Sequence, residues 1–206
     1  MKQKIRVIIL LLLLIVVIGS IMFITKNKNS ESKSKQEILY YNNFKFKKGI
    51  IGWYTLIKVG NRSFNVSFLY SPKEVENISV EKRINDLILK KKLIYITTDP
   101  FYSARVSQAQ VEISKITSPR THVFGILNIP TMITVTYIPE GYEYKNIKPA
   151  DCSMANESIG VIKLLIGDEN KVYKKDGCVI VEGKNEYEIV KVADRLSYNL
   201  LGIIPP

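Results

Sequence analysis

The two cysteines, Cys152 and Cys178, are the residues whose chemistry constrains this chain most. They lie on either side of an expected strand, residues 158–166. In an oxidising compartment such a pair favours a disulfide, which would stabilise the fold by roughly 3 kcal/mol. In a reducing compartment the same residues would be two unconnected buried thiols. A catalytic thiol has less support, because the chain contains no C-x-x-C motif.

The single histidine, His122, could act as a base or a metal ligand only with partners that the sequence does not identify. Together with both cysteines it would form a zinc set that lacks one ligand and has no standard spacing. We therefore expect His122 at the surface or at the end of a strand. We expect no metal site and no cofactor.

Carboxylates provide the catalytic alternative. Asp99, Glu112, Asp151 and Asp194 could meet in the fold, as paired acids do in glycosidases. Asp99, however, is better explained as the N-cap of a helix. Asp194 and its neighbour Arg195 are typical of a surface or helix-end pair. The sequence therefore predicts no catalytic residue, and an envelope enzyme that uses carboxylates is the alternative.

Four asparagines begin N-x-[ST] triplets, which are the acceptor motif for N-glycosylation. They are Asn61, Asn65, Asn77 and Asn156. The number is slightly above what this composition gives by chance. These candidate glycosylation sites agree with a domain outside the cell.

An unbroken uncharged segment, residues 7–25, dominates the N-terminal part of the sequence. As a helix it would be about 28 Å long, close to the hydrocarbon thickness of a bilayer. A cleaved secretory signal is the competing interpretation, but its apolar region is usually shorter and ends in a small-residue motif. The basic tail, 1–6, favours an uncleaved signal-anchor with the rest of the chain outside the cell. We expect a single-pass protein of the cell membrane.

The net charge of +11 is divided almost evenly between the N-terminal part and the rest of the chain. Residues 26–37 form a polar tether without any large apolar residue. The remaining domain, 38–206, is therefore only moderately basic. Such a balance is weak support for nucleic-acid binding, which we do not expect, and fair support for contact with an anionic surface.

Hydrophobic periodicity predicts an α+β domain over residues 38–206, with a mixed sheet and about three soluble helices. The expected helices span 79–91, with Ser79 as its cap, a segment from Asp99 through Ile116, and 186–201. The expected strands are 44–48, 51–59, 64–68, 93–97, 133–137, 158–166, 171–173 and 178–181. Two strand-helix-strand units in this order predict that part of the sheet is parallel.

Three segments carry a resemblance to known proteins: YITTDP at 95–100, GCVIVEGK at 177–184 and VADRLSYNLLGI at 192–203. The chain resembles single-pass membrane proteins of small-genome archaea that share an N-terminal anchor, two spaced cysteines and a closing helix. That group has no assigned activity, so the resemblance implies no catalytic residue. It implies an archaeal envelope location and supports pairing of Cys152 with Cys178.

These observations predict a membrane-anchored extracytoplasmic domain that binds a partner or an envelope component without catalysis. Its partners would be the lipid bilayer and an envelope protein or surface polymer. Besides the envelope enzyme, a structural subunit of a membrane complex is an alternative. The sequence does not decide the oligomeric state.

Overall fold

The computed structural model describes residues 18, 20, 36–119, 125–143 and 147–206. The chain divides into two compact units, Met1–Gln36 and Glu37–Pro206. Apart from Ile18 and Ser20, the predicted membrane span 7–25 lies outside the described residues. Within the described residues, no helix combines the length and the apolar character needed to cross a bilayer. The anchor therefore stays a prediction.

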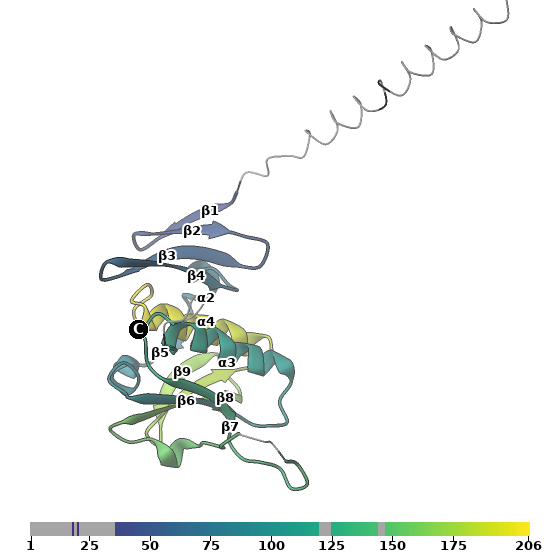
Figure 1. Cartoon of the computed structure of the whole chain (residues 1–206), viewed down its shortest axis with the longest axis vertical. Coiled ribbons are helices and arrows are strands. Elements are labelled where there is room, and N and C mark those ends of the chain that lie inside the picture. The colour runs from purple at the N-terminus through teal and green to yellow at the C-terminus, as the bar shows by residue number, and fades with distance from the viewer. Residues whose placement is uncertain (1–17, 19, 21–35, 120–124, 144–146) are drawn as a thin grey trace, which may run out of the picture. The chain divides into compact units, whose positions relative to one another are not determined.

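The second unit begins with a four-stranded antiparallel sheet in which consecutive strands are neighbours (Figure 1). In β2, Phe44 and Phe46 face the interior whereas Lys45 and Lys47 face solvent, as the alternation of the sequence predicted. The strands are β1 (Ile38–Tyr41), β2 (Phe44–Lys48), β3 (Trp53–Val59) and β4 (Arg62–Phe68).

A six-stranded mixed sheet forms the other side of the unit, with the order β5-β9-β10-β8-β6-β7. Strands β7, β6, β8 and β10 run parallel, whereas β9 is antiparallel to β10. The predicted partly parallel sheet is thus confirmed. Its strands are β5 (Ser79–Val80), β6 (Leu93–Thr98), β7 (Thr131–Val135), β8 (Ile159–Ile166), β9 (Lys171–Lys175) and β10 (Cys178–Gly183).

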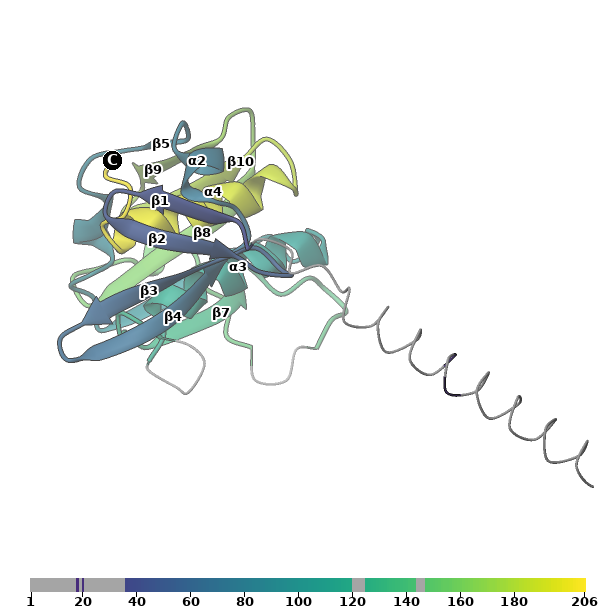
Figure 2. The same ribbon diagram turned by 90° about the horizontal axis from the view of Figure 1, so that it is seen from above.

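Helices separate the two sheets, so the unit has three layers (Figure 1). Seen from above, the four-stranded sheet lies across the two long helices (Figure 2). The described residues of this unit contain three α-helices, which confirms the α+β class: α2 (Pro72–Val75), α3 (Ala104–Thr117) and α4 (Glu188–Leu200). Two short 3₁₀ helices, η1 (Ile84–Leu87) and η2 (Cys152–Met154), complete the elements.

The predicted helix over 79–91 is wrong. Ser79 and Val80 pair instead with β9 as strand β5. Arg83 then adopts a left-handed conformation, φ 67°, which a continuous α-helix does not allow. Ile84 and Ile88 are nevertheless buried, because a 3₁₀ turn delivers the same apolar residues to the core.

The predicted N-cap of the next helix is also corrected. The Asp99 carboxylate accepts a hydrogen bond from the Phe101 amide, at 2.9 Å, within the loop that follows β6. The cap of α3 is Ser103, whose hydroxyl accepts from the Arg105 amide. The helix therefore starts later than predicted, although its buried stripe from Val106 to Ile116 is the predicted one.

Aromatic rings hold the four-stranded sheet to the helix layer. The ring of Tyr198 on α4 stacks on Phe68 of β4, with centroids 4.1 Å apart. It also meets the edge of Phe46, at 5.9 Å. All three side chains are fully buried. The main core therefore lies on the helix side of both sheets.

Candidate functional site

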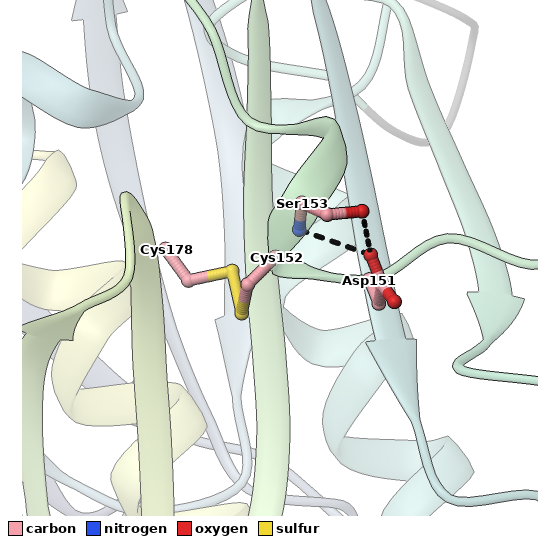
Figure 3. Close-up of a disulfide and its surroundings, with 4 residues drawn as sticks. All are labelled: Asp151, Cys152, Ser153 and Cys178. Carbon is pink, nitrogen blue, oxygen red and sulfur yellow. Dashed lines mark hydrogen bonds between the residues drawn. A yellow bond between two sulfur atoms is a disulfide. The ribbon is translucent and has the colours of Figure 1, made fainter.

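The two cysteines are joined across the outer face of the six-stranded sheet (Figure 3). Cys152 lies in η2 and Cys178 begins β10, with 5.3 Å between their Cα atoms. The predicted pair is therefore at disulfide distance. Cys178 is fully buried in a small apolar cluster with Tyr95 and Ile180. This bond fastens η2 to the sheet, which is a structural role.

Asp151, one of the candidate acids, lies directly beside this bond (Figure 3). Its Oδ1 accepts hydrogen bonds from the amide of Ser153, at 3.0 Å, and from its hydroxyl, at 2.6 Å. These bonds lower the pKa of the Asp151 carboxyl, because they favour the charged form. Asp151 therefore caps η2 and stays ionised.

Three of the four predicted glycosylation asparagines are exposed: Asn61, Asn65 and Asn77. Asn156 is exposed too, but its side chain folds back on the loop. Its Oδ1 accepts from the amides of Ser158 and Ile159, and its Nδ2 donates to the Met154 carbonyl. A glycan would have to be attached to this nitrogen, which already donates to the loop, so Asn156 fits the predicted modification less well.

Two candidate acids do come together, but in the interior. Glu112 of α3 and Asp194 of α4 are both buried, and the charge of Glu112 acts on the Asp194 carboxyl. Lys115 forms an ion pair with Glu112 and donates to the Ser67 carbonyl of β4 at 3.2 Å. Asp194 Oδ2 accepts from the Tyr70 amide at 2.8 Å. These groups fasten the end of β4 to both long helices.

The predicted surface pair Asp194–Arg195 is wrong, because both residues are buried, at 0% and 2% exposure. The Arg195 guanidinium donates hydrogen bonds to three backbone carbonyls, those of Ile78, Ile204 and Pro205. The cause is the position of α4, which is covered on two sides. Charged side chains on such a helix cannot face water, so they form hydrogen bonds with the backbone of nearby loops.

The environment of Asp194 predicts a measurable pH dependence. Burial, and then the charge of Glu112, raises the pKa of the Asp194 carboxyl well above its ordinary value. The folded state therefore binds a proton that the unfolded chain, with a carboxyl pKa of about 3.9, has already lost. This group's contribution to stability is present at low pH and is lost as the pH rises through the folded pKa.

We expect Asp194→Asn to remove this loss while keeping an oxygen for the Tyr70 amide. Urea unfolding of variant and wild type at several pH values between 4 and 8 measures it. The difference in unfolding free energy should shift in favour of the variant as the pH rises. A difference that stays constant over this range would contradict the prediction.

Glu112 and Asp194 are 7% and 0% exposed, so neither carboxylate faces open solvent. A cavity of about 480 Å³ lies elsewhere, between β2, β3 and the end of α4. Its lining includes Lys45, Lys58 and Leu201 and no carboxylate. Among the described residues, no three His, Cys, Asp or Glu side chains are placed to hold a metal ion. His122 lies outside the described residues.

The candidate functional site is instead an exposed aromatic surface that the sequence did not predict. It is formed by Phe101, Tyr137, Tyr187 and Arg105, and we call it the aromatic edge. The Phe101 and Tyr137 rings lie 6.4 Å apart, and the Arg105 guanidinium lies 4.6 Å above the Tyr187 ring. All four side chains are exposed.

Backbone geometry explains why these residues meet. Phe101 follows β6, Tyr137 follows β7 and Tyr187 follows β10, and these three strands run parallel. Their carboxyl ends therefore lie at one edge of the sheet, where ligands commonly bind in parallel sheets. Two hydrogen bonds hold the loop that follows β6: the Ser103 amide donates to Glu186, and the Ile166 amide donates to the Tyr102 hydroxyl.

The aromatic edge carries one positive charge, on Arg105, and a neutral tyrosine hydroxyl, on Tyr137. Partial burial, and then the nearby charge of Asp99, raises the pKa of the Tyr137 hydroxyl. Tyr137 is therefore neutral at physiological pH and can donate a hydrogen bond. Arg105 carries a permanent positive charge beside an aromatic face. This combination suits recognition of a surface and provides no nucleophile or general base.

Comparison of the chain with protein-family models, with curated proteins and with solved structures finds no match. The resemblance to archaeal membrane proteins therefore stays a prediction. Function must be inferred from the exposed residues of the fold itself.

Proposed function

We propose that this chain is a membrane-anchored extracytoplasmic binding protein that holds a partner protein at the aromatic edge. The observation that carries the proposal is the gathering of three exposed aromatic rings and Arg105 at the carboxyl ends of parallel strands. The apolar segment 7–25 would keep the domain at the membrane, and the tether 26–37 would let it reach its partner.

The composition of the aromatic edge favours a protein as the ligand. Aromatic residues and Arg are enriched in protein interfaces, and Tyr and Arg are frequent among the residues that dominate binding energy. The loop that carries Phe101 is held by hydrogen bonds from Ser103 and to Tyr102, so this part of the edge needs little ordering when a partner binds. A preorganised surface of this kind needs no catalytic group.

An envelope enzyme has less support. The acids that lie close together, Glu112 and Asp194, are buried beneath the four-stranded sheet. Asp99 and Asp151 each accept hydrogen bonds from the loop that follows them. A structural subunit of a membrane complex remains the second alternative, and stoichiometric copurification of membrane partners would distinguish it.

Site-specific crosslinking in native membranes tests the proposal. With a photoreactive phenylalanine at position 101 of the full chain, we expect one discrete crosslinked protein. The same group at Leu89, an exposed apolar position of another segment, is the control and should not give that product. Equal crosslinking at both positions, or none at position 101, would overturn the proposal.

A double variant measures how much the edge contributes. Replacing Tyr187 and Arg105 together by serine should reduce the crosslink from position 101 at least tenfold, because such residues often dominate binding. The thermal unfolding midpoint should stay unchanged, since both side chains are exposed. An undiminished crosslink would place the binding energy elsewhere.

A further inference from the structure

The loop between β2 and β3 exposes apolar side chains to an unusual degree. Ile50 is 103% exposed and Ile51 is 67% exposed. The loop is nevertheless well defined, since the Gly49 amide donates to the Gly52 carbonyl at 2.9 Å. Gly52 has a φ of 78°, which glycine adopts without strain. Two isoleucines, Ile50 and Ile51, therefore face solvent in a closed turn, and we call residues 49–52 the hairpin tip.

Two basic residues lie immediately before this hairpin tip in the sequence. Lys47 and Lys48 immediately precede Gly49. Lys47 lies on the outer face of the sheet, and its cross-strand neighbours are the uncharged residues Ile38 and Tyr54. Lys48 is held by Glu37 at 2.8 Å and lies 5.3 Å from the Trp53 ring. Apolar side chains beside lysines match a membrane interface, where acyl chains and anionic headgroups meet.

The chain enters the folded unit beside this same tip. The Lys48 amide donates to the Glu37 carbonyl at 2.9 Å, and Ile38 pairs with Lys47. Glu37 is also the last residue of the polar segment 26–37 that follows the predicted membrane span. As a random coil, that segment would reach roughly 20 Å. The hairpin tip therefore lies next to the point where the polar segment joins the sheet.

We propose that the hairpin tip is a second membrane contact, in which Ile50 and Ile51 enter the interface and Lys47 binds anionic headgroups. This inference rests on the proposed membrane anchor. The anchor would hold the tip at a high effective concentration near the bilayer, so a weak contact is sufficient. Two attachments instead of one would restrict how the domain turns above the membrane.

Fluorescence of the full chain in vesicles tests the inference. An Ile50→Cys variant can be labelled at that position alone, because Cys152 and Cys178 are joined to each other. The probe is an environment-sensitive dye, and the vesicles are phosphatidylcholine with about a third phosphatidylglycerol. The matched control is Asn61→Cys, in the turn at the opposite end of β3.

We expect blue-shifted emission from position 50, with strong quenching by lipids that carry a nitroxide just below the headgroup. The probe at position 61 should emit as it does in water and resist quenching. If the chain floats with the vesicles but both probes emit as they do in water, the second contact is overturned and the anchor is supported. If the chain does not float at all, both the anchor and the second contact fail.

Two further variants separate the lipid from other occupants. Ile51→Ser should weaken quenching at position 50, and Lys47→Gln should reduce the preference for anionic over neutral vesicles about fivefold. Blue-shifted emission that nitroxide lipids do not quench, and that increases with the protein-to-lipid ratio, would indicate contact with a second copy of the chain. That result would overturn the membrane contact.

Discussion

Replacing Tyr198 by alanine is expected to lower the free energy of unfolding of the domain by about 4 kcal/mol. The ring is fully buried and stacks on Phe68, and it also touches Phe46. Its hydroxyl donates to the Tyr70 carbonyl at 2.8 Å. Alanine would leave a cavity between the four-stranded sheet and α4, and two aromatic rings would lose their partner.

The conservative variant Tyr198→Phe separates the two contributions. It keeps the ring and removes only the hydrogen bond, so a loss of about 1 kcal/mol is expected. Urea unfolding of both variants, followed by circular dichroism, gives the comparison. If the alanine variant lost no more stability than the phenylalanine variant, the aromatic cluster would not be what holds the sheet to the helices.

The second large effect concerns the bond between Cys152 and Cys178. Replacing both by serine should cost about 3 kcal/mol, by the loop-closure estimate, and lower the thermal midpoint by about 10 °C. Cys178 is also buried, so its serine must satisfy a hydroxyl inside an apolar cluster. Thermal unfolding of the double variant provides the measurement.

Reductant supplies the matched control. It should lower the midpoint of the wild type by a similar amount and leave the double variant unchanged. If the domain lies outside the cell, as proposed, thiol reagents should label the wild-type cysteines of native membranes only after reduction. Labelling without reductant would contradict the proposed topology as well as the bond.

Local patterns predicted the strands well and one helix badly. The alternation of Phe44, Lys45 and Phe46 reports a half-buried strand directly, because side-chain direction depends only on neighbouring residues. The segment from Ile84 to Ile88 has helical spacing, yet it forms a 3₁₀ turn after strand β5. The deciding interaction is the pairing of β5 with β9, about ninety residues further along the chain, and a local hydrophobic period cannot reveal such a pairing.

The candidate site was missed for a related reason. Phe101, Tyr137 and Tyr187 belong to three separate loops, and only the strand order brings them together. One signal was available for two of them, since Phe101 and Tyr187 each follow a predicted strand by a few residues, whereas Tyr137 was predicted to end the strand 133–137. Asp194 and Arg195 were placed at the surface because a helix usually buries one face. In α4, 11 of the 13 residues are buried, so that assumption failed.

The place of α4 in the layers has a consequence for how the protein is made. During synthesis the four-stranded sheet leaves the ribosome long before Tyr198, the residue against which Phe46 and Phe68 pack. Until then the part of its apolar face that packs on α4 stays uncovered. Contacts of such long sequence separation form slowly, and uncovered strands invite aggregation. Export through a narrow channel would suit this order, because the chain could cross the membrane before it becomes able to fold.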